Sequence, residues 1–290
     1  MKVAAVIVTF NRKDLLLETI RGVLAQSRPP EKIFLIDNAS TDGTAEAVEQ
    51  MADDGRLSYY RLDKNTGGAG GFSYGMQLAQ AEGYDWYWTM DDDVEPRRDA
   101  LETMLKYTHI SECINATKIF TKNGEVQYWE QYYDFATNRL IDLKNASFWN
   151  GKDWCATNVA CFEGMLISER VVSKIGLPDP GYFIYQDDTV YGIKASLWTN
   201  VIYVRDAVFD KKIYGYGAVT PMRAYYYFRN SFRLKRDIFA TGAVGGATKL
   251  TNILFFINLA HAALKMLRER FDWSIVTSIG KGLADGYKGR

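Results

Sequence analysis

Cysteine is scarce in this chain of 290 residues, and its three copies follow no recognisable pattern. Cys113, Cys155 and Cys161 form no CxxC pair and are odd in number, which argues against a disulfide framework or a zinc site. We expect reduced, mostly buried thiols. We also expect no secretory signal, because no basic segment and cleavage site precede the apolar run that begins at Val3. The sequence therefore predicts a cytoplasmic protein.

The chain lacks an uncharged run long enough to span a membrane. Its most apolar stretch has fifteen uncharged residues between Lys249 and Lys265, whereas a spanning helix requires about 20 mostly apolar residues. Polar side chains such as Asn258 and His261 also interrupt the stretch. We expect an interfacial helix or one helix of a bundle.

Net charge is zero overall, yet the two ends of the chain differ in sign. Residues 211–290 hold 14 of the 35 Lys and Arg but only 4 of the 35 Asp and Glu, which leaves 21 basic and 31 acidic residues in 1–210. A basic segment of this kind is typical of regions that meet anionic lipid or nucleic acid. The alternative is a helical subdomain docked on the acidic body.

The first part of the chain alternates apolar runs with helical spacing. Residues 3–9 and 32–37 are rich in β-branched and other apolar residues, which is typical of strands covered on both faces. Helical patterns follow over residues 13–26 and 44–51. This β-α-β-α order predicts an α/β fold with a doubly wound, mainly parallel sheet. Ligands would bind at the carboxyl ends of the strands, where Thr9 and Asp37 would lie.

A glycine-rich turn, residues 67–71, separates a predicted strand over residues 59–62 from a predicted helix over residues 72–82. Such a turn at the start of a helix can offer backbone N–H groups to phosphate. It matches neither GxGxxG nor a P-loop, and ordinary flexible turns look the same. It therefore supports phosphate binding only in combination with other motifs.

Three consecutive carboxylates, Asp91, Asp92 and Asp93, end an aromatic run that begins at Tyr84. Their charges repel one another, so a folded chain keeps them at a strand end mainly where a cation or hydrogen-bond donors neutralise them. A hard divalent metal fits this requirement. An acidic turn on the surface is the alternative.

Four short motifs stand in order along the chain: TFNR at 9–12, IDNASTDGT at 36–44, NTGG at 65–68 and MDDD at 90–93. Together they resemble the large inverting family of GT-A glycosyltransferases, whose fold is Rossmann-like, with a mainly parallel mixed sheet between helices. The GGAGGF turn followed by DDDV is most similar to the galactofuranosyltransferase branch, with rhamnosyltransferases as neighbours. The similarity covers about residues 3–215.

The resemblance implies a donor site for a UDP-sugar and a metal site for Mn²⁺ or Mg²⁺. Asp91 and Asp93 would be the metal ligands. The donor site would comprise Thr9, Arg12 and Asp37 at the uridine, Asn65, Gly67 and Gly68 along the diphosphate and sugar, and Asp92.

A second carboxylate pair, Asp187 and Asp188, follows the apolar run 181–185 and precedes a predicted amphipathic helix. An inverting transfer needs a base that takes the proton of the acceptor hydroxyl while a metal stabilises the departing diphosphate. The resemblance implies that Asp188 is this base and that Asp187 orients the acceptor or the base. A helix cap is the alternative role for either residue.

The sequence departs from the family pattern at two places. Val190 stands where the family often has a second acidic residue, which puts one acceptor contact in doubt. Residues 207–210, after a strand expected over residues 201–204, stand where a histidine commonly completes the metal site, and neither His109 nor His261 aligns there. We expect Asp210 to replace that histidine as a direct or water-mediated ligand. An ion pair with a neighbouring base at the surface is the alternative.

These observations predict a GT-A catalytic domain over residues 1–220 and a basic, amphipathic helical region over residues 221–290. The expected function is metal-dependent, inverting transfer of galactofuranose from its UDP donor to a bacterial surface glycan. A lipid-linked acceptor and an anionic membrane surface are the expected partners, with no nucleic acid. The rivals are a dTDP-rhamnose-dependent rhamnosyltransferase and a nucleotide-sugar-binding scaffold without turnover. A nucleotidyltransferase would need a basic, glycine-rich phosphate loop, which residues 9–14 do not provide.

Overall fold

The computed structural model describes residues 1–51, 55–127, 131–142, 151–214, 218–242 and 249–290. The strands are β1 (Val3–Thr9), β2 (Lys32–Asp37), β3 (Leu57–Arg61), β4 (Trp86–Asp91), β5 (Val94–Pro96), β6 (Cys113–Phe120), β7 (Val126–Gln127), β8 (Gln131–Asp134), β9 (Arg139–Asp142), β10 (Trp154–Thr157), β11 (Met165–Ser168) and β12 (Val201–Lys211). The helices are α1 (Lys13–Leu24), α2 (Thr44–Glu49), α3 (Gly67–Ala81), α4 (Ala100–Leu105), α5 (Glu169–Ile175), the 3-10 turn η1 (Pro180–Tyr182), α6 (Asp187–Ala195), α7 (Pro221–Ala240), α8 (Lys249–Glu269) and α9 (Trp273–Lys288).

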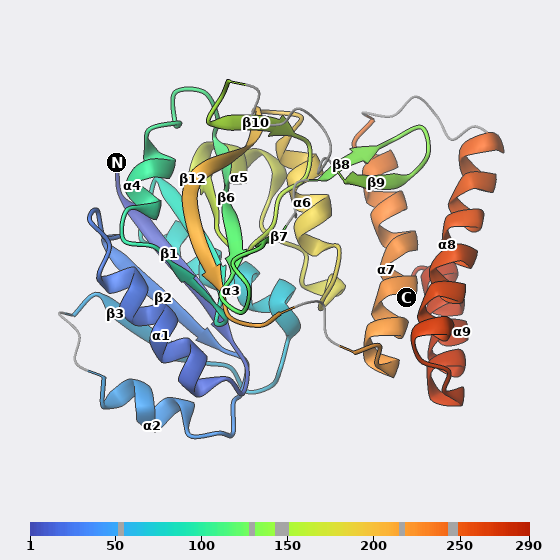
Figure 1. Ribbon diagram of the computed structural model, residues 1–290, viewed down its shortest axis with the longest axis horizontal. Helices are drawn as coiled ribbons and strands as arrows, with labels where there is room; N and C mark the ends of the chain where they lie inside the picture. The colour runs from blue at the N-terminus through green and yellow to red at the C-terminus, as the bar shows by residue number, and fades with distance from the viewer. Residues whose placement is uncertain (52–54, 128–130, 143–150, 215–217, 243–248) are drawn as a thin grey trace.

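A mixed sheet forms the centre of the molecule (Figure 1). Its strands run in the order β10-β12-β6-β11-β4-β1-β2-β3, with β5 paired to β12 and β7 paired to β6. The strands β1 to β4 are parallel, and β11 is antiparallel to both of its neighbours. The predicted α/β class, with a mainly parallel mixed sheet between helices, is therefore confirmed.

Alternation along β1 explains why both faces of the sheet are covered. Successive side chains of a strand point to opposite faces, and β1 is apolar at every position from Val3 to Val8. Its odd-numbered residues join a core with α1, α2 and α4, whereas its even-numbered residues join a core with α3, α5 and α6. A continuous apolar run thus becomes a strand buried on both sides.

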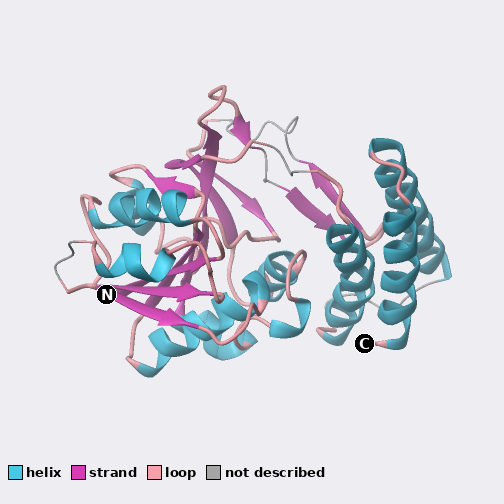
Figure 2. Cartoon of the chain, turned by 90° about the horizontal axis from the view of Figure 1, so that it is seen from below, coloured by secondary structure: helices cyan, strands magenta, loops and turns pink. Residues whose placement is uncertain are grey.

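The C-terminal helices α7, α8 and α9 lie beside one another next to the sheet domain (Figures 1 and 2). α7 contributes to two cores: Leu234 and Ile238 pack with Tyr182 of η1 and with residues of α6, whereas Phe228 packs with residues of α8 and α9. The helical character predicted for this region is confirmed. By length and composition alone, Leu250–Glu269 could cross a membrane.

Two predicted elements have different bounds in the structure. α3 begins at Gly67, so the glycine-rich stretch forms the first turns of the helix and does not precede it. β12 continues to Lys211 because a register shift between Val204 and Val208 lets the strand resume after a bulge. Burial and pairing between strands decide where α3 begins and where β12 ends. Neither burial nor strand pairing can be read from a few neighbouring residues. Cys113 and Cys161 are buried, as expected for mostly buried thiols, and Cys155 is half-buried.

Candidate active site

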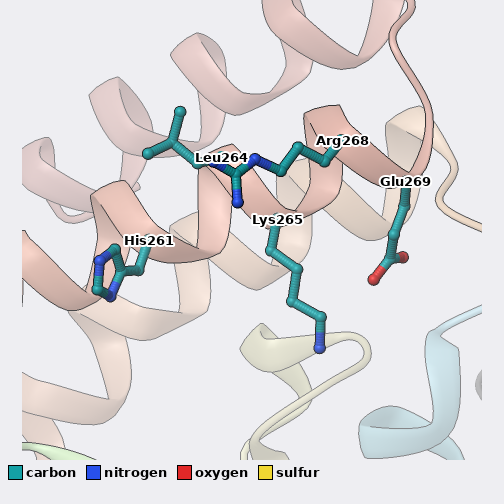
Figure 3. A pocket seen from close by; sticks show the side chains of 5 residues that line it. All are labelled: His261, Leu264, Lys265, Arg268 and Glu269. Atoms are coloured by element: carbon teal, nitrogen blue, oxygen red, sulfur yellow. The ribbon is translucent and has the colours of Figure 1, made fainter.

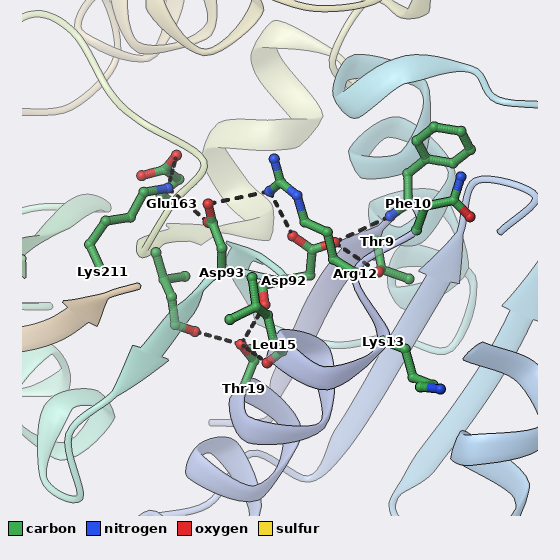
Figure 4. A network of polar contacts seen from close by, with 12 residues as sticks. Thr9, Phe10, Arg12, Lys13, Leu15, Thr19, Asp92, Asp93, Glu163 and Lys211 are labelled. Carbon is green, nitrogen blue, oxygen red and sulfur yellow. Dashed lines mark hydrogen bonds and ion pairs between the residues drawn. The ribbon is translucent and has the colours of Figure 1, made fainter. Parts of the chain in front are cut away.

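The carboxyl ends of β1, β2 and β4 bring the first predicted site residues together. Thr9 pairs in register with Asp37 of β2, and Val8 pairs with Asp91 of β4. Parallel strands end at the same edge of a sheet, so three segments far apart in sequence meet there. This edge carries the polar network drawn in Figure 4.

Asp92 is the buried anchor of this network. Its carboxylate accepts hydrogen bonds from the Thr9 hydroxyl at 2.8 Å, the Phe10 backbone N–H at 3.2 Å and the Arg12 guanidinium at 3.0 Å. Burial raises the pKa of Asp92, although Arg12 and Thr9 oppose the shift. Thr9, Arg12 and Asp92 therefore lie together, as a common donor site requires, and Asp92 positions the segment after β1.

Asp91, Asp93 and Glu163 form the group best suited to hold a metal. One oxygen of each carboxylate lies within 4.8 Å of the others. Burial raises the pKa of Asp91 well above its ordinary value, and repulsion from Glu163 and Asp93 adds to the shift. Carboxylate oxygens are the ligands that Mg²⁺ and Mn²⁺ prefer, and a divalent cation would relieve this repulsion. The donor set therefore fits the implied metal.

Two cations already lie against this group. The Lys211 ammonium donates to Asp93 at 2.7 Å and to Glu163 at 2.8 Å, and Arg12 donates to Asp93 at 3.3 Å (Figure 4). Burial would lower the pKa of Lys211, but Glu163 and Asp93 outweigh it and raise that pKa. Lys118, which is almost completely buried, donates to the backbone carbonyl of Glu163. The site thus combines carboxylates with fixed positive charges.

Sequence reasoning missed Glu163 and Lys211. The only local signal for Glu163 is a carboxylate and a glycine directly before the apolar strand β11, a pattern too common to single out. Lys211 is the last residue of β12, a position that depends on the bulge after Val204. Both residues reach the site through pairing of distant strands.

The structure does not bring Asp210 to the metal group. Its carboxylate accepts from the Arg97 guanidinium, with the shortest contact at 3.0 Å. Because side chains alternate along a strand, Asp210 and Lys211 point to opposite faces of β12. The prediction of Asp210 as a metal ligand is corrected accordingly: its neighbour Lys211 faces the carboxylates, and Asp210 forms the ion pair named as the alternative, with Arg97 as its partner.

Asp37 lies at the predicted edge but is completely buried. Its two oxygens accept from the Ser40 backbone N–H at 2.8 Å and from the Tyr59 hydroxyl at 2.6 Å. These bonds stabilise the loop after β2. They leave Asp37 beneath the surface of the site, whereas a contact with uridine would require an accessible oxygen.

The start of α3 is fixed from both sides. Asn65 accepts from the Gly67 backbone N–H at 2.7 Å, and Asn38 donates to the Gly67 carbonyl at 3.1 Å. Gly67 has φ +73°, and a Cβ there would lie 1.9 Å from the Phe183 carbonyl oxygen, so only glycine fits. A Cβ at Gly68 would meet nothing closer than 4.0 Å. The NTGG motif therefore lies directly against the segment that precedes Asp187.

Asp187 and Asp188 occupy the first turn of α6. The N-cap is Gln186, which makes no side-chain cap bond, so neither aspartate is the cap of this helix. One Asp188 oxygen accepts from the Thr189 backbone N–H at 2.6 Å. Burial raises the pKa of both carboxyls; repulsion by Asp188 adds to the shift at Asp187, and repulsion by Glu163 adds to the shift at Asp188. A raised pKa suits a carboxylate that must accept a proton.

The comparisons with known proteins agree with this geometry. Residues 4–171 match the family model described as "Glycosyl transferase family 2". The chain is 29% identical over 190 residues to galactofuranosyltransferase GlfT1 of Mycolicibacterium smegmatis, which covers 64% of this chain and 62% of that protein. It is 27% identical over 214 residues to a GalNAc(5)-diNAcBac-PP-undecaprenol beta-1,3-glucosyltransferase of Campylobacter jejuni, covering 69% of this chain and 59% of that protein.

Solved structures share the fold at low sequence identity. S. aureus TarS 1-349 in complex with UDP-GlcNAc has a TM-score of 0.63 and 12% identity, covering 99% of this chain and 81% of that one. A mannosyltransferase from Pyrobaculum calidifontis, in complex with GDP-Man and Mn²⁺, has a TM-score of 0.60 and 17% identity, covering 100% of this chain and 76% of that one. The fold is therefore that of GT-A glycosyltransferases.

Proposed function

Because the chain belongs to glycosyl transferase family 2 and is a glycosyltransferase, we propose that it transfers a sugar from a UDP-sugar donor. The proposed transfer depends on a metal and inverts the configuration of the anomeric carbon. One observation carries this proposal: two acidic groups converge, the Asp91, Asp93 and Glu163 cluster and the half-buried Asp188 beside the buried Asp187. The ring of Phe162, the neighbour of Glu163, lies 5.5 Å from that of Tyr191 in α6, so the segment that carries Glu163 packs on the helix that carries Asp188. Nucleotide-sugar binding by a scaffold without turnover would not need a second acidic group.

The proposed reaction assigns a task to each group. The Asp188 carboxylate takes the proton of the acceptor hydroxyl. The acceptor oxygen bonds to the anomeric carbon on the face opposite the diphosphate, and the anomeric C–O bond breaks with its electron pair leaving on UDP. Asp91, Asp93 and Glu163 would hold Mn²⁺ or Mg²⁺, which when bound supplies Lewis-acid stabilisation of the leaving diphosphate.

Galactofuranose is the donor sugar that we propose, and a lipid-linked surface glycan is the proposed acceptor. The sugar is supported by the name of the GlfT1 relatives, and the lipid link by that of the Campylobacter jejuni relative, which includes PP-undecaprenol. The matches span less than two thirds of these relatives. A rhamnosyltransferase that uses dTDP-rhamnose remains the rival.

A donor panel tests this proposal. We expect UDP-galactofuranose with Mn²⁺ or Mg²⁺ to raise the melting temperature more than other UDP-sugars or dTDP-rhamnose do, and to be slowly hydrolysed. Thermal shift and release of free UDP are the measurements. A larger shift and hydrolysis with dTDP-rhamnose would select the rival, and binding without any hydrolysis or transfer would favour the scaffold.

We further propose that α8 rests on the anionic inner face of the cytoplasmic membrane. Its outer face exposes large apolar side chains at helical spacing, namely Leu250, Ile253, Phe256, Ile257 and Leu264. Its opposite face is buried in the helical core shared with α7 and α9. An interfacial helix of this type gains from apolar insertion and from basic side chains at its border.

The border of this apolar face is basic. Arg268 lies beside Leu264, Lys265 projects from the next position of α8, and His261 lies one turn earlier, while Glu269 adds a carboxylate (Figure 3). Cations near an anionic lipid surface add attraction that salt screens. Apolar insertion and charge would thus act on the same helix.

Vesicle binding provides the test for α8. We expect the protein to co-sediment with vesicles that contain phosphatidylglycerol, to bind less to pure phosphatidylcholine, and to detach partly as salt rises. Ile253→Ser combined with Ile257→Ser should abolish binding. Trp198→Ser is the matched control, since Trp198 is 59% exposed but lies outside α8. Unchanged binding of the double variant, or none by the natural sequence, would leave α8 as a bundle helix only.

A further inference from the structure

The segment between η1 and α6 has an unusual backbone. Phe183, Tyr185 and Gln186 have φ values of +66°, +67° and +68°, in the left-handed region that non-glycine residues rarely adopt. All three lie within the four residues that precede Asp187. A backbone strained in this way persists only where its surroundings hold it. We refer to residues 182–186 as the strained loop.

The side chain of Asn230 in α7 holds the strained loop through hydrogen bonds to the backbone of the loop. Its side-chain amide donates to the carbonyl oxygens of Tyr182 at 3.0 Å, Ile184 at 2.7 Å and Tyr185 at 2.9 Å. Asn230 is completely buried. An amide carries two hydrogens, so three carbonyls share them, and every donor that this side chain has faces the loop.

The orientation of the Asn230 amide is set by Arg229. The Asn230 side-chain oxygen accepts from the Arg229 guanidinium at 2.9 Å and 2.8 Å. A guanidinium only donates, so the oxygen of the amide faces Arg229 and its NH₂ group faces the carbonyls. Arg229 also donates to the Tyr182 carbonyl at 2.9 Å.

The strained loop is held on its other side by α3. The Phe183 carbonyl accepts from the Ala69 backbone N–H at 3.2 Å and lies against Gly67. The Phe183 ring stacks on Tyr226 of α7, with ring centroids 4.8 Å apart. The loop therefore lies between the start of α3, at the proposed donor site, and α7.

We propose that Asn230 is a positioning residue for the transfer reaction: it holds the strained loop in the conformation that presents Asp188 to the acceptor. This inference rests on the proposed function, because it assumes that Asp188 is the base. It also makes α7 part of the active-site support, although α7 lies in the helical region after the GT-A core. The essential feature is an NH₂ donor at position 230, not the volume of the side chain.

Asn230→Asp tests the proposal, because it keeps the shape and replaces the donor by an acceptor that faces three carbonyls. We expect the kcat of UDP-galactofuranose hydrolysis to fall by roughly 100-fold, the cost of misplacing a reacting group by about 1 Å. Donor KM and the Kd of UDP with Mn²⁺ should stay within about twofold, since Asn230 bonds to the carbonyls of Tyr182, Ile184 and Tyr185, whereas the Phe183 carbonyl is held at the start of α3 by Ala69. Asn230→Ala, which adds no charge, should show the same split and serves if the aspartate variant does not fold.

Asn258→Asp is the matched control. Asn258 of α8 also donates from its amide to a backbone carbonyl, that of Thr137 at 2.9 Å, but away from the strained loop. Its substitution should leave kcat unchanged. A rescue variant adds a second readout: Gln186→Gly relieves the left-handed strain, so it should restore part of the kcat lost in Asn230→Asp.

The outcomes separate the inference from the proposed function. A kcat near that of the natural sequence in both Asn230 variants would overturn the inference, as would an equal loss in Asn258→Asp or a parallel loss of UDP binding. Absence of UDP binding and donor hydrolysis by the natural sequence would instead overturn the proposed function on which the inference rests.

Discussion

Asp188→Asn is expected to lower the rate of sugar transfer by about 10²- to 10⁴-fold, the usual contribution of a general base. The substitution keeps the shape of the side chain but removes its capacity to take a proton. The Kd of UDP with Mn²⁺ should not change, because Asp188 lies outside the group of Asp91, Asp93 and Glu163. Rates of transfer or donor hydrolysis and calorimetric UDP binding are the measurements.

The pH dependence of the same variant adds an independent check. Burial raises the pKa of Asp188 to about 6, and only the ionised form can act as a base. Activity of the natural sequence should therefore rise as pH increases through about 6. A pKa higher in the folded than in the unfolded state means that ionisation costs stability as pH rises through that value. Asp188→Asn removes this cost, so it should melt at a higher temperature than the natural sequence at pH 8.

Asp206→Asn is the matched control for Asp188→Asn, since the Asp206 side chain is 61% exposed and forms an ion pair with its neighbour Arg205. It should change neither the rate nor the pH profile. Near-normal turnover of Asp188→Asn at saturating acceptor would show that another group is the base.

Removing the metal with a chelator should abolish transfer and weaken UDP binding, and Mn²⁺ or Mg²⁺ should restore both. Asp93→Asn should reproduce this loss, with metal-dependent UDP binding weakened by roughly tenfold or more, because an ionised ligand at contact distance is worth more than 1.4 kcal/mol at a partly buried site. Asp93 also pairs with Lys211 and Arg12, so its variant should melt at a lower temperature. Titrations of Mn²⁺ followed by electron paramagnetic resonance, with and without UDP, measure the effect.

Asp210→Asn is the control that the structure supplies for this experiment. Its carboxylate pairs with Arg97 on the other face of β12, so metal titrations should match those of the natural sequence. If Asp210→Asn lost metal binding as Asp93→Asn does, the carboxylate would have to reach the site when UDP is bound. Transfer that survives complete removal of metal would refute the metal dependence itself.

Local patterns were sufficient to predict the sheet domain and the edge at which its site lies. The apolar runs 3–9 and 32–37 are short and rich in β-branched and other apolar residues, which is typical of strands buried on both faces. The order of strands and helices then required parallel pairing, which places Thr9, Asp37 and Asp91 at one edge. The helical character of residues 221–290 was also readable from spacing alone.

Tertiary structure decided which side chains complete the site. Glu163 and Lys211 reach it through antiparallel pairing of β11 and through a bulge in β12, and the sequence does not specify either register. A one-residue difference in position along β12 determines whether Asp210 or Lys211 faces the carboxylates, because side chains alternate across a strand. Local sequence cannot resolve a difference of that size.

The helical region shows the same division between local and distant information. The sequence predicts that the region over residues 221–290 is helical, but it cannot say which neighbours its helices meet. Asn230 contacts the strained loop only because α7 packs on η1 and α6, a contact between segments more than 40 residues apart. Local sequence thus determined the elements and their order, since propensity and period act over a few residues. The packing of distant segments, which depends on the whole chain at once, decided the partners of each functional side chain.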